Sequence, residues 1–281
     1  MALTERPKRR FWNALVPTIL LTLFLVGVPA MAMGVPLASG HTGAVVYGGA
    51  LGQGGITHSC TGGTTTPVES ENWAGYAVET CLSSPASGAV TFVHGSWVEP
   101  ALKCGSTDTY AAFWVGIDGY SSGTVEQTGT LAECMGGVAH YSAWYEMYPK
   151  YPVTFPLSIS PGNRLAGTVS YSGGVFTITL KDVTTGAHST VKIRDTQDAR
   201  SSAEWIAEAP YDNGILPLAD FGTVTFQDCR ATLLGVNGPI NDLSWQNARI
   251  DMVNSAGSLK ASTGPLSSTG ESFTITWVAS N

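Results

Sequence analysis

Two segments of this chain alternate strictly between large apolar residues and threonine. Residues 176–180 read Phe-Thr-Ile-Thr-Leu, and residues 273–277 read Phe-Thr-Ile-Thr-Trp. Alternation with a period of two, built from β-branched and aromatic residues, is typical of strands with one face in a core. Turn-forming clusters recur along the chain, as at residues 121–123, 172–174 and 184–186. The pattern therefore predicts many short strands joined by turns, which favours a β-sandwich or a β-barrel.

Helical periodicity is weak by comparison. No long segment has the apolar spacing of an amphipathic helix, and residues 199–208 fit either a short helix or a strand. We find no internal repeat and no domain boundary after Pro67. We therefore predict an all-β fold with a single folded domain over residues 67–281.

The N-terminal segment has the three parts of a secretory signal peptide. Basic residues at positions 8–10 precede an apolar run from Phe11 to Val28, and Ala30-Met31-Ala32 forms a small-residue cleavage site. The apolar run also approaches the length that spans a membrane, so an uncleaved anchor is the alternative to a signal peptide over residues 1–32. Residues 33–66, with ten glycines and no charged residue, indicate a flexible leader or short pro-segment. The mature protein is therefore expected to be secreted.

Charged side chains are scarce and mostly acidic. They make up 12% of the chain, against roughly 25% in typical soluble proteins. The formal charge is -7, and it becomes -10 without residues 1–32, which hold four basic residues and one acidic residue. Nucleic acids and anionic membrane surfaces attract basic patches. Neither is expected as a partner of the mature chain.

All five cysteines follow the expected cleavage site, at positions 60, 81, 104, 134 and 229. Export makes disulfides plausible, and an odd count leaves at least one cysteine unpaired within the chain. The best candidate pair is Cys104 and Cys134, because they bracket the segments that contain Trp114 and Gln127. Sequence alone does not fix the pairing. No Cys-x-x-Cys pair is present, which argues against a structural zinc site.

Two acidic residues lie among large aromatic side chains. Glu146 is in the segment 144–148, and Glu208 ends the segment 204–208. A carboxyl group beside apolar rings is costly to bury, and its pKa moves away from the solution value, as acid–base chemistry requires. Gln127 adds an amide that can donate to an oxyanion. The alternative is that both acids lie on a solvated strand face, with the aromatic residues on the core face.

Other kinds of catalytic site find less support. Residues 119–123 match Gly-x-Ser-x-Gly, but a nucleophile elbow needs a helix after it, and we interpret this stretch as a turn. No Asp-Thr-Gly or Asp-Ser-Gly is present, which argues against a pepsin-like pair of aspartates. The five histidines are scattered without the spacing of metal ligands, so no metal site is predicted.

Six blocks follow one another in an order known from one protein family. They are Glu71-Asn72-Trp73-Ala74-Gly75, Trp114-Val115-Gly116-Ile117-Asp118-Gly119, Gln127-Thr128-Gly129, Ala143-Trp144-Tyr145-Glu146-Met147-Tyr148-Pro149, Ala203-Glu204-Trp205-Ile206-Ala207-Glu208 and Phe221-Gly222-Thr223-Val224-Thr225-Phe226. The blocks resemble the motifs of the glutamic peptidases, the eqolisins. The resemblance spans residues 71–226 and, more weakly, the C-terminal strands.

This resemblance implies a β-sandwich of two packed, curved antiparallel sheets, of the concanavalin or lectin-like kind, with the active site on the concave face. It also implies a secreted endopeptidase that is active in acid and is often made as a precursor. The expected partners are protein or peptide substrates. We expect the mature chain to be a monomer that uses no cofactor.

By motif, the family's catalytic pair corresponds to Gln127 and Glu208 here, with Glu208 rather than Glu204 as the catalytic acid. Ionised Glu208 would take a proton from the attacking water while the Gln127 amide stabilises the oxyanion. Protonated Glu208 would then pass its proton to the leaving amine, without a metal or a covalent intermediate. If the segment is a strand, Glu204 and Glu208 have the same parity and lie on one face.

Further motif residues receive supporting roles from the same resemblance. Trp73 and Trp114 match cleft aromatics that pack against substrate side chains, with ordinary core packing as the alternative. Glu146 matches a carboxylate that orients the catalytic groups, and Tyr148 belongs to the same block. Asp118 either has a similar role or holds the turn that follows it, and we favour the turn.

Two other functions remain open from the residues. A lectin-like module that binds carbohydrate without cleaving it would also use a sheet face rich in Trp and Tyr. A glycosidase with Glu146 and Glu208 as its acid pair would place the two carboxyl groups about 5–10 Å apart across a groove. The joint presence of Gln127 and Glu208 in their motifs favours the peptidase.

Overall fold

The structure is a computed structural model that describes residues 46–47, 60–195 and 197–281. The signal peptide predicted over residues 1–32 lies outside the described residues, as does most of the leader predicted over residues 33–66. The described residues form seventeen strands and no helix, so the prediction of an all-β fold is confirmed. A membrane-spanning helix, long and apolar enough for that task, does not occur among them.

The two alternating segments form strands with one face in the core. Residues 176–180 lie in β10 (Val175–Asp182), and residues 273–277 form β17 (Phe273–Trp277). Phe176, Ile178 and Ile275 are completely buried, whereas the intervening threonines keep some exposure. The two-residue period of the sequence therefore matches the two faces of each strand.

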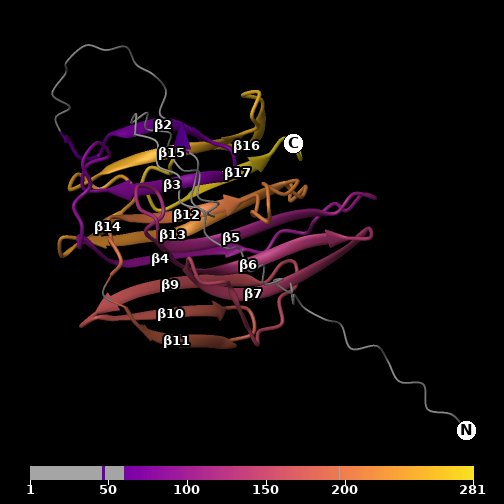
Figure 1. The fold of residues 1–281 in the computed structure, drawn as a ribbon, viewed down its shortest axis with the longest axis horizontal. Helices are drawn as coiled ribbons and strands as arrows, with labels where there is room; N and C mark the ends of the chain where they lie inside the picture. Colours follow the sequence, from indigo (N-terminus) through magenta and orange to yellow (C-terminus); the bar gives the residue numbers. More distant parts are fainter. Residues whose placement is uncertain (1–45, 48–59, 196) are drawn as a thin grey trace, which may run out of the picture. The chain divides into compact units, whose positions relative to one another are not determined.

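Strand pairing arranges the described strands in two layers, which overlap in the view of Figure 1. The first layer contains, in order of pairing, β2 (Thr65–Ser70), β15 (Gln246–Val253), β3 (Trp73–Glu79), β12 (Ser202–Glu208), β5 (Thr109–Ile117), β6 (Val125–Met135), β7 (Val138–Tyr148) and β8 (Val153–Phe155). The second layer contains β11 (His188–Arg194), β10, β9 (Arg164–Ser172), β4 (Val90–Val98) and β13 (Thr223–Leu233), and β13 also pairs with β14 (Val236–Pro239) and β17.

The two layers are joined along one side. β16 (Leu259–Thr263) pairs with β15 of the first layer and with β17 of the second, so the strands form one continuous hydrogen-bonded sheet. A short strand, β1 (Val46–Tyr47), pairs with β2.

All of these pairings are antiparallel except one, between β2 and β15. The chain reverses between β2 and β3 at residues 71–72, but β15 lies between the two strands instead of letting them pair directly. Because β15 is antiparallel to β3, it must be parallel to β2. The expectation of purely antiparallel sheets therefore fails at this one pair.

A large apolar core lies between the layers. It includes Phe113 and Trp205 from the first layer, and Trp97 and Phe226 from the second. The Trp205 indole donates a hydrogen bond of 2.7 Å to the carbonyl oxygen of His94 in the opposite layer. A Cβ atom at Gly95 would lie 2.6 Å from this indole, so only glycine allows the close approach.

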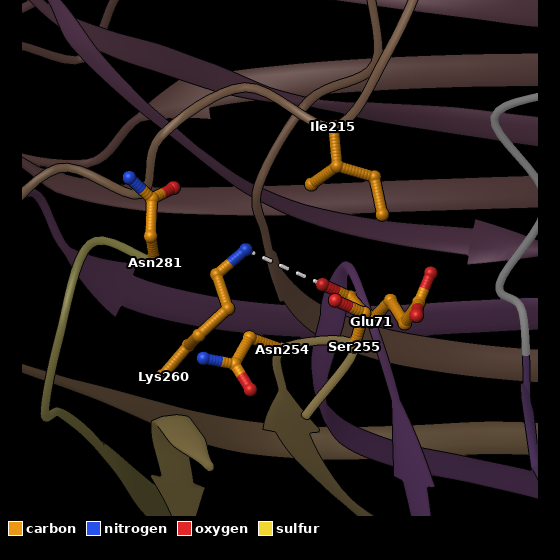
Figure 2. Close-up of a pocket in the computed structure, with 6 residues that line it drawn as sticks. All are labelled: Glu71, Ile215, Asn254, Ser255, Lys260 and Asn281. Atoms are coloured by element: carbon orange, nitrogen blue, oxygen red, sulfur yellow. Dashed lines mark hydrogen bonds between the residues drawn. The ribbon is translucent and has the colours of Figure 1, made fainter. Parts of the chain in front are cut away.

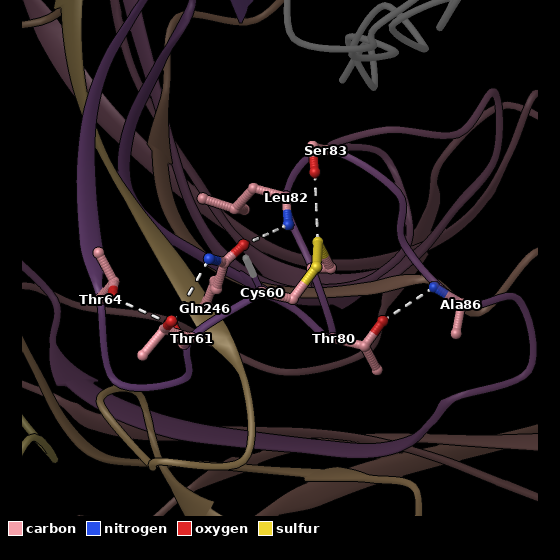
Figure 3. The surroundings of a disulfide bond; sticks show 9 residues. Cys60, Thr61, Thr64, Thr80, Leu82, Ser83, Ala86 and Gln246 are labelled. Carbon is pink, nitrogen blue, oxygen red and sulfur yellow. Dashed lines mark hydrogen bonds between the residues drawn. A yellow bond between two sulfur atoms is a disulfide. The ribbon is translucent and has the colours of Figure 1, made fainter. Parts of the chain in front are cut away.

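Two disulfides fasten the first layer. Cys104 and Cys134 are bonded, as the sequence suggested, and Cys60 is bonded to Cys81. Figure 3 shows the surroundings of the second bond, where Gln246 donates to the carbonyl oxygen of Thr61 and accepts from the amide of Leu82. The fifth cysteine, Cys229, is free and buried.

The folded part of the chain begins before Pro67, where the sequence placed the start of the domain. Cys60 is bonded to Cys81, and β2 begins at Thr65.

Candidate active site

Strand register places the candidate residues on one region of the first layer. β12 runs between β3 and β5, and Glu208 is the register partner of Trp73 on β3. Two strands away, Gln127 on β6 is the register partner of Glu146 on β7. Strand pairing thus brings Glu208 beside Trp73, and Gln127 beside Glu146.

The alternation of β12 decides which side chains face the interlayer core. Ala203, Trp205 and Ala207 belong to that core. Ile206 belongs to a second apolar cluster, which lies on the opposite face and also contains Trp73 and Trp114. Glu208 has the parity of Ile206, so it lies on this second face.

The Glu208 carboxyl group is surrounded by hydrogen-bond donors. Nε1 of Trp114 donates to Oε2 of Glu208 over 2.7 Å, and Nδ2 of Asn72 donates to Oε1 over 3.4 Å. The Trp73 indole N–H also faces this carboxyl group, but it does not meet hydrogen-bond geometry. Two hydrogen bonds, one from Trp114 on β5 and one from Asn72 just before β3, therefore fix the position of this acid.

Burial raises the pKa of Glu208 to about 8. The Trp114 hydrogen bond opposes this shift because it stabilises the ionised form, and the nearby Glu146 charge adds to the increase. The Glu208 carboxyl group therefore keeps its proton at pH values well above the usual pKa of a glutamic acid.

Gln127 is held by the second acid of the site. Its Nε2 donates to Oε2 of Glu146 over 2.6 Å, and both side chains are buried. Burial raises the pKa of Glu146 to about 7, and the Gln127 hydrogen bond lowers it. An amide NH₂ has two donors, so the contact with Glu146 leaves one N–H of Gln127 for a ligand.

Aromatic rings fill the same face of the layer. Trp73 and Trp114 meet edge to face, with their ring centroids 4.9 Å apart. Trp144, Tyr120 and Tyr148 are partly buried and pack against this apolar cluster. The predicted residues Trp73, Trp114 and Tyr148 therefore belong to or pack against one cluster, on the same face as Glu208 and away from the interlayer core.

Asp118 makes a different set of contacts from those of Glu208 and Gln127. Its carboxylate accepts hydrogen bonds from the backbone N–H groups of Arg200 and Ser201, at 2.5 and 2.9 Å, and from the hydroxyl of Ser122 at 3.0 Å. Asp118 also has a positive φ of 70°. It therefore fastens the turn after β5 to the segment that leads into β12.

The same turn contains the Gly-x-Ser-x-Gly match at residues 119–123. The Ser122 hydroxyl accepts from the backbone N–H of Gly119, and the Ser121 hydroxyl donates to Glu79. No helix follows, because β6 begins at Val125. The match is therefore a structural turn and not a nucleophile elbow.

Sequence reasoning did not identify several buried polar residues. Asn72 had no assigned role, although it directly precedes Trp73 in the first sequence block. Glu79, Glu99 and Glu126 are also buried acids whose pKa is raised by burial. No sequence signal separates these acids from exposed ones. Within the described ranges, no group of three or more His, Cys, Asp or Glu is arranged to hold a metal ion.

Known proteins share this fold and sequence pattern. The profile of the Peptidase A4 family matches residues 71–277. Aspergillopepsin-2 from Aspergillus niger is 31% identical over 246 residues, covering 77% of this chain and 80% of the relative.

Two solved structures have a fold similar to that of this chain. Scytalido-glutamic peptidase with a transition state analog inhibitor is 25% identical, with a TM-score of 0.62, and the match covers 74% of this chain and 98% of that one. Aspergilloglutamic peptidase from Aspergillus niger is 32% identical, with a TM-score of 0.53, over 60% of this chain and 99% of that one. The described strands therefore form a β-sandwich of the kind found in those structures.

Proposed function

The chain belongs to the Peptidase A4 family, the glutamic peptidases, and from this membership we propose that Glu208 and Gln127 are the catalytic residues of a secreted acid endopeptidase. Peptides are the substrates that the family implies. The observation that carries the proposal is the paired arrangement of the site. Trp114 and Asn72 hold Glu208, while Glu146 holds Gln127 on the same face.

The reaction is general-base hydrolysis. Ionised Glu208 takes a proton from a water molecule as the water oxygen attacks the scissile carbonyl carbon. The remaining N–H of Gln127 donates to the oxyanion of the tetrahedral intermediate. Protonated Glu208 then gives its proton to the leaving amine as the C–N bond breaks. A donor such as Gln127 contributes about 10²–10³ in rate, and a positioned base about 10²–10⁴.

The raised pKa of Glu208 bears directly on the first step. A carboxyl group with a pKa of about 8 is protonated in acid, whereas the general base must be ionised. The reacting water adds an O–H donor next to this carboxyl group, and donors stabilise the ionised form and lower its pKa. Trp114 and Asn72 act in the same direction. Ionisation of Glu208 in the hydrated, substrate-loaded site is therefore part of the proposal.

From the same family membership we infer the shape of the two layers. We infer that they are two curved sheets of the lectin-like kind, with the site on the concave face of the first layer. The pairing order and the second apolar cluster, which lies opposite the interlayer core, support this arrangement. Two disulfides, which form in oxidising compartments, support secretion.

Hydrolysis of a denatured protein between about pH 2 and 7 tests the assignment. The wild type is compared with Glu208→Gln and with Glu204→Gln, a matched change on the same face of β12. We expect proteolysis to be lost in Glu208→Gln and retained in Glu204→Gln, with both variants folded by circular dichroism. Near-normal proteolysis by folded Glu208→Gln would exclude Glu208 as the base.

A further inference from the structure

A pocket with a buried cation includes Glu71, the residue that precedes Asn72 of the candidate active site. It has a volume of about 300 Å³ and is lined by Glu71, Ile215, Asn254, Ser255, Lys260 and Asn281. Figure 2 shows the Lys260 amine directed into the space between Ile215 and Asn281. Lys260 is 4% exposed, which is unusual for a charged side chain without an ionic partner.

Lys260 is incompletely satisfied by its neighbours. Its Nζ donates one hydrogen bond, of 3.3 Å, to the backbone carbonyl oxygen of Glu71. An ammonium group has three donors. Among the described residues, no carboxylate forms an ion pair with Lys260, and Figure 2 shows the Glu71 carboxylate turned away from the amine. A buried cation in this state favours an anionic ligand that can enter the pocket.

The local fold adds a second donor and fixes the walls of the pocket. Oδ1 of Asn254 accepts from the backbone N–H groups of Ala256 and Ser258 in the turn between β15 and β16. The Asn254 amide N–H donors therefore remain for a ligand. The backbone N–H groups of residues 278 and 279 both donate to the carbonyl oxygen of Lys260, which brings the segment that contains Asn281 to the pocket.

The pocket is connected to the catalytic acid by adjacent residues. Glu71 accepts the Lys260 hydrogen bond, and the next residue, Asn72, donates to Glu208 over 3.4 Å. The Lys260 amine is therefore on the order of 10 Å from the Glu208 carboxyl group, which corresponds to about three residues of an extended peptide.

We propose that this pocket is a substrate subsite in which Lys260 and Asn254 bind a carboxylate located about three residues from the scissile bond. The inference rests on the proposed function of Glu208 and Gln127. The carboxylate is either an Asp or Glu side chain or the C-terminal carboxylate of a short peptide. These two sources present the same group to the amine, so peptides that carry only one of them distinguish between the sources.

The experiment uses the full-length protein and a set of matched peptides that share one cleavage site. One series replaces Gln by Glu at each position near the scissile bond, and another compares a C-terminal amide with the free acid. At about pH 5 both kinds of carboxylate are ionised. We expect the wild type to show a kcat/KM about tenfold higher for the acidic member of at least one pair at this distance. The preference should vanish near about pH 2.5, where the substrate carboxylate is protonated.

Variants assign the preference to the pocket. The acidic-to-neutral ratio should fall to about one in Lys260→Met and be retained in Lys260→Arg. Lys192→Met, on exposed β11, is the matched control and should keep the wild-type ratio.

The outcomes separate this inference from the proposed function. If the wild type cleaves neutral peptides but shows no preference, the subsite is wrong and the catalytic assignment stands. A preference that survives in Lys260→Met also overturns the subsite. If the wild type cleaves no peptide at all, both proposals fall.

Discussion

Nε1 of Trp114 donates a hydrogen bond of 2.7 Å to Oε2 of Glu208, which lies 94 residues further along the chain. Trp114 projects from β5, and Glu208 ends the neighbouring strand β12. Replacement of Trp114 by Phe keeps an aromatic ring but removes the donor. A hydrogen bond to a charged group is worth roughly 1.5–3 kcal/mol, so the pKa of Glu208 should rise by about 1–2 units.

The pH profile of kcat/KM measures this change. If Glu208 must be ionised, the rising limb should move to higher pH in Trp114→Phe. Trp144→Phe is the control, because Trp144 packs in the same apolar cluster but makes no hydrogen bond with Glu208. Superimposable profiles for Trp114→Phe and the wild type would show that the titration does not belong to Glu208.

Gln127→Ala should lower kcat by about 10²–10³, because the oxyanion loses its amide donor. Glu146→Gln tests the support of that amide. It replaces the carboxylate acceptor of the 2.6 Å bond, so it should loosen Gln127 and reduce kcat less than Gln127→Ala does. Steady-state kinetics with one peptide substrate distinguish the two effects. A larger loss in Glu146→Gln than in Gln127→Ala would mean that Glu146 acts directly on the substrate.

The stability of the folded protein should fall as the pH rises from about 5 to 8. Glu99 illustrates the reason. Burial raises its pKa to about 7, although Thr130 and Trp97 donate to it. An unfolded Glu titrates near about 4.3, so the folded form retains its proton over a higher pH range. The stability due to this group is complete below about pH 4 and is lost progressively as the pH rises through 7, by about 4 kcal/mol in total.

Thermal unfolding at several pH values tests this prediction. Glu99→Gln cannot ionise, so its melting temperature should decline less than that of the wild type between about pH 5 and 8. Asp212→Asn changes an exposed acid and should follow the wild type. Equal declines in Glu99→Gln and the wild type would remove Glu99 as a source of the pH dependence.

Asp118→Asn should destabilise the domain without changing the charge of the catalytic pair. The carboxylate accepts from both backbone N–H groups of residues 200–201, and an amide offers only one acceptor oxygen. We expect a loss of about 2–3 kcal/mol in the free energy of unfolding, measured with denaturant. Activity at low temperature should change little. A large loss of kcat with unchanged stability would instead place Asp118 in the chemistry.

Features that depend on a short stretch of the chain can be predicted from the sequence. The period-two alternation of residues 176–180 and 273–277 predicts β10 and β17, and the bracketing of Trp114 and Gln127 suggested the Cys104–Cys134 bond. In both cases the signal lies within a short stretch of the chain. The ambiguity at residues 199–208 is resolved as β12, because this segment has both β3 and β5 as pairing partners.

Contacts that depend on strand register could not be predicted in this way. The bond from Asn72 to Glu208 joins residues 136 positions apart, and it exists only because β12 pairs with β3 in one register. The parallel pairing of β2 with β15 is non-local for the same reason. Burial of Glu99 likewise depends on neighbours from other strands. Nothing in the surrounding residues marks that acid as buried.

The Cys60–Cys81 bond limits where cleavage of the backbone can release an N-terminal leader. It ties the segment before β2 to the residues that follow β3. A cut between Thr61 and Thr64 would break the backbone but leave the N-terminal piece covalently attached through sulfur. A leader can leave under oxidising conditions only if the cut lies before Cys60. Sequencing of the mature N-terminus should therefore find its first residue at or before this cysteine.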